Sequence, residues 1–209
     1  MQPNGQSALG RRARRWLRRF RPDAADRARR EVADRLYREL VKQARTPLFY
    51  RALGVPDTPE GRFEMVGLHV ALVVRRLRAA GAPGRALAQE LFDQMCADMD
   101  ESLRHIGIGE LAVGRHVKRL AGHFYARLRA LDQVLDAAPR APLTPMLRTN
   151  VYHGGAAPSP HQLDALASYL LAVEAALCAQ ASGRLLAGEV GWAPPEGPPA
   201  QTLCESTKP

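Results

Sequence analysis

Hydrophobic residues along this chain recur at the spacing of a helix face, and no stretch has the alternation of a strand. Apolar positions three, four or seven residues apart lie on one side of an α-helix. The pattern predicts helices from about residue 25 to 46, 59 to 80, 87 to 106, 110 to 135 and 159 to 186. With an N-terminal amphipathic helix added, we expect an all-α fold, an irregular bundle of about six helices with a disordered C-terminal tail.

Capping residues indicate where two of these helices begin. Asp57 or Thr58 can accept hydrogen bonds from the free N–H groups of a helix that starts at Pro59. Ser159 and Gln162 have the spacing of a capping box. The helix that starts at Pro59 is apolar nearly all round its middle, so we expect it to be the central and most buried one.

Proline and glycine divide the rest of the chain. Residues 139–158 hold four prolines and two glycines, which predicts a connector with one helical turn. The residues from Gly188 onward are again rich in both types, which favours disorder. We therefore expect three parts: a basic amphipathic arm (1–22), a helical domain (23–187) and a Pro/Gly-rich tail (188–209).

The net charge of +9 lies at one end of the chain. Residues 1–45 hold fourteen basic and five acidic residues, whereas the remainder holds sixteen of each. This asymmetry predicts an anionic partner for the N-terminal end only.

Three separated cysteines without a CxxC motif indicate a reducing compartment. The most apolar stretch, about ten residues from Met65 to Val74, is too short to span a membrane and indicates a core helix.

The arm combines an apolar stripe with an arginine-rich surface. Its candidate membrane-contacting residues are Arg11, Arg12, Arg14, Arg15, Trp16, Leu17, Arg18, Arg19 and Phe20. Each basic residue near an anionic bilayer contributes about 1 kcal/mol, and the apolar stripe could enter the headgroup region. An anionic membrane surface is our first interpretation. Docking on the protein's own core, RNA binding and a mitochondrial targeting segment remain alternatives.

Motifs for catalysis, phosphate binding or metal binding are missing from the sequence. There is no GxSxG motif, and Cys96 lies on an apolar helix, where a free cysteine is typically a small core residue. Gly107 and Gly109 follow a helix rather than a strand, so they indicate a helix end and not a phosphate loop. His116 and His123 lie about 10 Å apart along a helix, too far to share one zinc. We expect no metal, no cofactor and no enzymatic activity.

An acidic run is the one unusual polar feature of the helical body. Glu90, Asp93, Asp98, Asp100 and Glu101 fall within twelve residues. Asp is a poor helix former, so several within one helix need a reason. They either form a solvated face with intrahelical pairs, such as one from Asp100 to Arg104, or they form an acidic ledge that contacts a basic partner or caps a neighbouring helix.

The same region resembles a known family, the ubiquinol–cytochrome c chaperones, over roughly residues 36–178. The similar residues are Leu91-Phe92-Asp93, Met95, Asp98-Met99-Asp100, Leu103-Arg104, Gly107, Gly109-Glu110-Leu111, Val113, Lys118, Phe124-Tyr125 and Arg127. Three further segments fit the same pattern: Gly61-Arg62-Phe63-Glu64, the apolar helix bearing His69, and Asn150-Val151-Tyr152. The arm and the tail lie outside the resemblance.

The resemblance implies a non-enzymatic, all-helical chaperone that binds newly made cytochrome b during assembly of respiratory complex III. It implies two further partners, a small partner chaperone and the ribosome. It also implies a location at the cytoplasmic face of the bacterial inner membrane or, alternatively, on the mitochondrial matrix side. The candidate partner-binding residues are Phe92, Asp93, Asp98, Asp100, Arg104, Phe124 and Tyr125. Two other functions stay open, a ribosome- or RNA-docking adaptor and a small enzyme that uses His116 or His123.

Overall fold

Helices make up nearly all of the structure, a computed structural model that describes residues 24–105, 110–137, 142–153 and 155–195. No strand occurs in these ranges, which confirms the predicted all-helical bundle. The expected arm helix (residues 1–22) and residues 196–209 lie outside the described part. The helices are α2 (Ala24–Ala44), α3 (Pro47–Arg51), α4 (Pro59–Ala79), α5 (Gly81–His105), α6 (Glu110–Asp136), α7 (Thr144–Asn150), α8 (Pro160–Ala179) and α9 (Ser182–Leu186).

Helix α4 is the centre of the bundle, as its sequence predicts. It packs against α2, α5, α6, α8 and α9, and every residue from Met65 to Val74 is buried. A helix with neighbours on all sides buries apolar residues all round, which is why α4 lacks a polar face. Burial of these apolar side chains removes them from water, which stabilises the fold.

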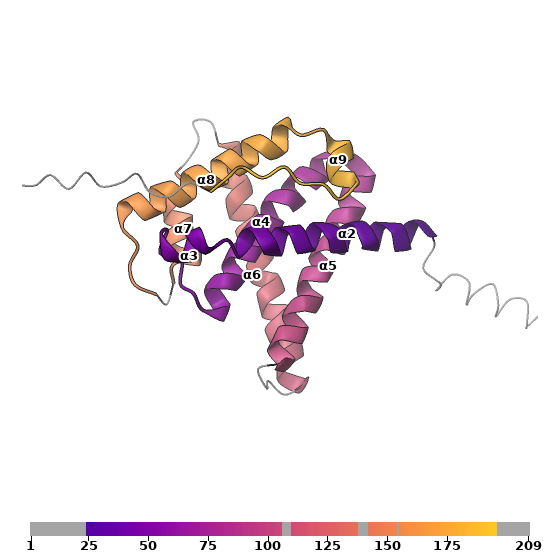
Figure 1. Cartoon of the computed structure of the whole chain (residues 1–209). Helices are drawn as coiled ribbons and strands as arrows, with labels where there is room; N and C mark the ends of the chain where they lie inside the picture. The colour runs from indigo at the N-terminus through magenta and orange to yellow at the C-terminus, as the bar shows by residue number, and fades with distance from the viewer. Residues whose placement is uncertain (1–23, 106–109, 138–141, 154, 196–209) are drawn as a thin grey trace, which may run out of the picture.

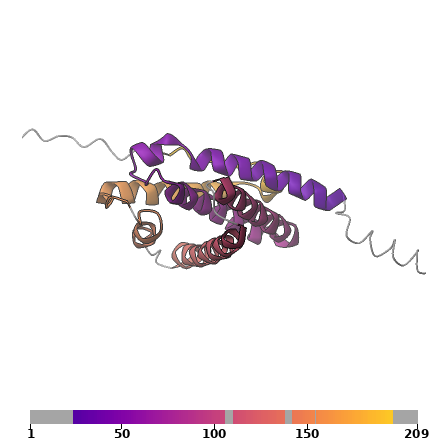
Figure 2. The same ribbon diagram turned by 90° about the horizontal axis from the view of Figure 1, so that it is seen from below.

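The helices around α4 lie in layers. Figure 2 shows α2 and α6 on opposite sides of the bundle, with α4 between them. Helices α5 and α6 form an antiparallel pair that contacts α4 at one end, and their other ends extend beyond the rest of the bundle (Figure 1). Helix α8 packs against α7 and against the middle and C-terminal part of α4, where Tyr169 meets His69 and Glu174 meets Arg75.

The helix ends follow the predicted signals. Thr58 caps α4 by accepting a hydrogen bond from the N–H of Gly61, and Ser159 forms the expected capping box with Gln162. Only Ala80 separates α4 from α5, and Gly81 makes the corner possible because its φ of 75° is one that residues with a Cβ rarely adopt.

Two helices differ from the prediction. The last long helix ends at Ala179 rather than near residue 186, because the chain becomes extended at Gln180 and then forms the short helix α9. Arg76 of α4 donates hydrogen bonds to the carbonyls of Leu177 and Gln180, which satisfies the end of α8. Helix α3 lies outside the predicted helices, and Pro47, which follows the expected end near residue 46, is the first residue of this new helix.

Part of the segment assigned to the tail packs against the bundle. The side chain of Gln180 donates to the carbonyl of Glu189 and accepts from the N–H of Gly191, which holds the chain against α8. The ring of Trp192 then lies 5.5 Å from the ring of His69 in α4. The packed chain therefore continues beyond residue 187, and a tertiary contact of one tryptophan outweighs the local proline and glycine content.

Helix α8 is, of the helices within the described ranges, the one long and apolar enough to cross a membrane by length and composition. Its apolar character has a second explanation in the fold. Leu163, Leu166, Leu170, Val173 and Leu177 are all buried against the bundle, so the helix contributes one face to the core as helices of globular domains do.

Candidate functional site

The structure divides the seven predicted partner-binding residues by burial. Phe124 is buried, Phe92, Asp98 and Asp100 are partly buried, and Asp93, Arg104 and Tyr125 are exposed. All seven lie on α5 and α6. They do not form one continuous site, so each group is considered with its own contacts. The arm residues Arg11 to Phe20 lie outside the described part of the chain.

Phe92, Phe124 and Tyr125 form an aromatic cluster between α5 and α6. The ring of Phe92 lies 5.2 Å from that of Phe124 and 4.9 Å from that of Tyr125. Phe124 is 1% exposed and belongs to the core, whereas Tyr125 is 38% exposed. The cluster therefore holds a rigid aromatic ring at the surface, and such rings are frequent anchors in protein interfaces because they lose little entropy on binding.

Two of the acidic residues of α5 pair within their own helix. Asp93 accepts a hydrogen bond of 2.8 Å from Gln89, and Asp100 accepts one of 2.8 Å from Arg104. Glu90 instead lies 3.6 and 3.5 Å from two arginines of α2. Exposed pairs of this kind contribute roughly 0–1 kcal/mol. These contacts match the first interpretation of the acidic run, a solvated face with intrahelical pairs.

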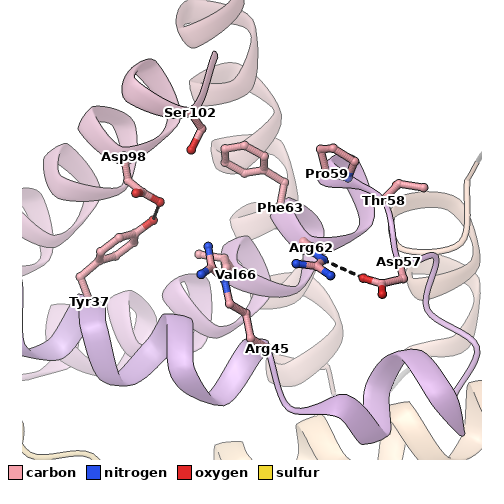
Figure 3. A pocket seen from close by; sticks show the side chains of 10 residues that line it. All are labelled: Tyr37, Arg45, Asp57, Thr58, Pro59, Arg62, Phe63, Val66, Asp98 and Ser102. Atoms are coloured by element: carbon pink, nitrogen blue, oxygen red, sulfur yellow. Dashed lines mark hydrogen bonds and ion pairs between the residues drawn. The ribbon is translucent and has the colours of Figure 1, made fainter. Parts of the chain in front are cut away.

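Asp98 differs from the other acidic residues because it borders a groove between α2, the start of α4 and α5. This α2–α4–α5 groove has a cavity volume of about 300 Å³, which is at the lower end of the range for ligand pockets. Its lining residues are Tyr37, Arg45, Asp57, Thr58, Pro59, Arg62, Phe63, Val66, Asp98 and Ser102 (Figure 3).

One polar pair lies at each end of the groove (Figure 3). At one end, the Tyr37 hydroxyl donates a hydrogen bond of 2.7 Å to Oδ2 of Asp98. Burial and this bond raise the pKa of Tyr37, so Tyr37 stays a neutral donor. At the other end, Arg62 donates to Asp57 at 2.6 Å, and this bond lowers the pKa of Asp57.

Arg45 supplies the one cation of the groove without a partner in the described structure. Its exposed side chain extends from the end of α2 into the groove, between the two polar pairs (Figure 3). Phe63 and Val66 of α4 form the apolar wall beside it. The charge of Arg45 acts on Tyr37, where it opposes the rise in pKa caused by burial. The groove thus combines an apolar wall with a free positive charge.

A buried ion pair joins two segments of the family resemblance. Arg127 of α6, which is 8% exposed, pairs with Glu64 of α4, and its guanidinium lies against Gly67, where a Cβ would come within 2.8 Å of Nη1. Burial raises the pKa of Glu64 despite the nearby arginine, and burial lowers the pKa of Arg127. For this pair, desolvation opposes the attraction between the charges, as is common for buried pairs.

Two other segments of the resemblance also stabilise the fold. The Tyr152 hydroxyl donates to the carbonyl of Leu53 at 2.7 Å. His69 is fully buried, with its ring nitrogens 2.7 Å from the Met65 carbonyl and 2.7 Å from the Tyr169 hydroxyl. Burial lowers the pKa of His69 to about 4, so His69 is neutral at pH 7. Much of the shared pattern therefore specifies structure, which leaves Tyr125 and the groove as the candidate contact surfaces.

No group of three or more His, Cys, Asp or Glu side chains with the geometry to hold a metal ion occurs in the described ranges. His123 is exposed, and the side chain of His116 lies outside the described residues. Burial raises the pKa of Cys96 to about 11, which suppresses the reactive thiolate. Cys96 is half-buried, so it is less enclosed than the expected core residue.

Sequence reasoning missed most of the groove. Its residues come from three separate segments and no local motif connects them. One signal was available on α2, where Tyr37 and Arg45 are eight residues apart and therefore lie close to the same face. The pattern indicated the apolar stripe of that helix, but it could not show which neighbour would face these two polar side chains.

A protein-family model described as ubiquinol-cytochrome C chaperone matches residues 51–192. The chain is 23% identical over 164 residues to ubiquinol-cytochrome c reductase complex assembly factor 1 of Mus musculus, a match that covers 78% of this chain and 55% of the relative. It is 24% identical over 179 residues to the Xenopus laevis assembly factor, covering 85% and 88% of the two chains. The chain therefore spans about half the length of the mouse relative.

A solved structure has a similar fold. The crystal structure of the Cbp3 homolog from Brucella abortus is 33% identical to this chain, with a TM-score of 0.71. The similarity covers 87% of this chain and 97% of that chain.

Proposed function

The chain belongs to the ubiquinol–cytochrome c chaperone family, and we propose that it is a non-enzymatic assembly chaperone that binds newly made cytochrome b during biogenesis of complex III. One observation carries the proposal, the match of the family model to residues 51–192, which include α4 to α9, the aromatic cluster and the α4 and α5 sides of the groove. The names of the mouse and frog relatives support it, since both are assembly factors of the ubiquinol-cytochrome c reductase complex.

The aromatic cluster is the surface that we propose for the client. Tyr125 is exposed and is fixed by its contacts with Phe92 and Phe124. A pre-ordered aromatic ring can bury apolar surface of a client without first losing conformational freedom. A membrane protein that has not yet been assembled exposes such apolar surface, so this chemistry suits cytochrome b.

The arm complements the client surface by placing the chaperone near its client. Seven arginines between residues 11 and 21, with no acidic residue among them, suit an anionic membrane surface. We propose that the protein works at the cytoplasmic face of the inner membrane, where cytochrome b is inserted. The division into arm, helical domain and tail is part of this proposal. A small partner chaperone and the ribosome are further proposed partners.

The deciding experiment is a pull-down of the tagged full-length chain from solubilised membranes. We expect cytochrome b to co-purify with the wild-type chain. Tyr125→Ala should reduce the recovered cytochrome b several-fold because the exposed ring is lost, whereas Arg129→Ala, an exposed position on the same helix, should not. Absence of cytochrome b from the wild-type pull-down would contradict the proposed client.

Gene deletion tests the biological role separately. Loss of the chaperone should deplete assembled complex III and leave other respiratory complexes at normal levels. Normal complex III after deletion would refute an assembly function. Recovery of ribosomes instead of cytochrome b would favour the ribosome-docking adaptor.

A further inference from the structure

The α2–α4–α5 groove has the properties of a docking site, and its charges restrict what could dock there. The ionisable side chains along it are Arg45, Arg62, Asp57 and Asp98, two of each sign. Arg62 and Asp57 already neutralise one another at 2.6 Å. A polyanion such as RNA would gain little from a groove with no net charge, because its affinity depends on neutralising many phosphates.

The two remaining charged groups of the groove, Arg45 and Asp98, are opposite in charge, and an apolar wall lies beside them. Arg45 can donate to an anionic oxygen. Asp98 uses Oδ2 to accept from Tyr37, and in the described structure its Oδ1 has no bonded partner, so it can accept another hydrogen bond. Phe63 and Val66 of α4 form this wall (Figure 3).

A polypeptide segment can supply all three complementary groups. Its carboxylate side chain would accept from Arg45, a large apolar side chain would cover Phe63 and Val66, and a backbone N–H would donate to Asp98. The volume of about 300 Å³ suits one such side chain and the adjoining backbone. A phosphodiester headgroup fits less well, because its phosphate supplies no apolar group to cover Phe63 and Val66.

We propose that the α2–α4–α5 groove binds a client segment in which a large apolar residue stands next to an aspartate or glutamate. The inference rests on the proposed function, because it takes the client to be cytochrome b. It adds a second contact surface to the aromatic cluster, and it assigns Arg45 as the residue that selects the acidic group.

Peptide binding to the full-length chain tests this assignment. Fluorescein-labelled 15-residue peptides that tile the extramembrane loops of cytochrome b serve as probes, measured by fluorescence anisotropy. We expect at least one peptide with an acidic residue beside a large apolar residue to bind. Arg45→Gln should weaken that binding about tenfold, the expected size of one charged hydrogen bond. Lys42→Gln, which removes the same charge from an exposed position of α2 outside the groove, should change it less than twofold.

A second pair of variants blocks the groove without removing a charge. Ser102 lines the groove and is exposed, so Ser102→Trp should fill the groove while the fold stays intact. Ser168→Trp, at an exposed position of α8, is its control. Changing the acidic residue of the peptide to its amide should weaken binding to the wild type about tenfold and should not weaken binding to Arg45→Gln any further.

The outcomes separate this inference from the proposed function. The groove inference is wrong if no peptide binds, or if Arg45→Gln and Ser102→Trp bind the peptide as the wild type does. The proposed function still stands in that case, provided that cytochrome b co-purifies with the chain. If cytochrome b does not co-purify, the proposed function is wrong, and so is the inference built on it. Binding of phosphatidylglycerol vesicles that depends on Arg45 would assign the groove to a lipid headgroup and overturn the inference.

Discussion

Replacing Arg127 by methionine isolates the energetics of the buried ion pair between α4 and α6. Methionine keeps the aliphatic part of the side chain and removes the charge, which leaves the Glu64 carboxylate in a site where its side chain is only 14% exposed. A buried charge without a partner is costly, and removing one member of a buried pair typically costs about 3–5 kcal/mol.

The structure limits the size of this loss, because Glu64 can take up a proton. The ordinary pKa of a glutamate here is 4.5, which is 2.5 units below pH 7. At about 1.4 kcal/mol per unit, protonation at pH 7 costs at most about 3.4 kcal/mol. We therefore expect Arg127→Met to lower the free energy of unfolding by about 2–3 kcal/mol at pH 7.

The loss should also depend on pH in one direction. Without Arg127, the pKa of Glu64 in the folded state lies well above its value in the unfolded chain, so the folded state binds more protons between these two values. Stability of the variant must then rise as the pH falls. At pH 5 the variant should lose less than about 1 kcal/mol of unfolding free energy, because protonating Glu64 costs little at a pH so close to its ordinary pKa.

Urea unfolding followed by circular dichroism at pH 7 and pH 5 measures this difference. The variant is compared with the wild type at each pH, which cancels the contributions of other groups. Arg129→Met, at an exposed position of the same helix, is the control and should stay within about 0.5 kcal/mol of the wild type. Glu64→Gln added to Arg127→Met should remove the pH dependence. An equal loss at both pH values, or a loss below about 1 kcal/mol at pH 7, would refute the reasoning.

Three further predictions use the same unfolding measurement. Gly84→Ala should destabilise the protein by more than about 2 kcal/mol, since its Cβ would lie 2.0 Å from a backbone carbonyl of α4, whereas Gly122→Ala, with nothing within 4 Å, should stabilise it by up to about 1 kcal/mol. The pKa of His69 in the folded state is about 4, below its ordinary value of 6.5, so the unfolded chain binds the proton first as the pH falls. This difference should make the wild type about 3 kcal/mol less stable at pH 4 than at pH 7. An equal loss of stability between pH 7 and pH 4 in His69→Gln would contradict the prediction. Tyr37→Phe should cost about 1 kcal/mol by removing the donor to Asp98, and no change would mean that water replaces the bond without loss.

Local sequence signals were sufficient to predict features that depend on residues within a single helix. The cap at Thr58, the capping box at Ser159 and the buried character of α4 all followed from residues within a few positions of one another. The intrahelical pair of Asp100 and Arg104 followed in the same way, from a spacing of four residues. The error at the end of α8 has a different origin, because its final turn is satisfied by Arg76 from another helix.

The candidate surfaces show the same division. The sequence named Phe92, Phe124 and Tyr125 through a family pattern, but only their ring contacts show that Phe124 belongs to the core and Tyr125 to the surface. The sequence named Asp98 without its partner, which lies 61 positions away at Tyr37.

By itself, the sequence determined the helical class, most helix boundaries, the separation of a basic arm from a neutral body and the family. The first three follow from periodicity, capping and composition, which are local properties of the chain, whereas the family follows from the resemblance of its motif residues. The tertiary structure alone decided that Glu64 faces Arg127, that Trp192 covers His69, and that Arg45 stands free in a groove. Such contacts depend on how helices cross. A helix's sequence indicates which of its faces is apolar, but not which neighbour that face or the polar side chains beside it will meet.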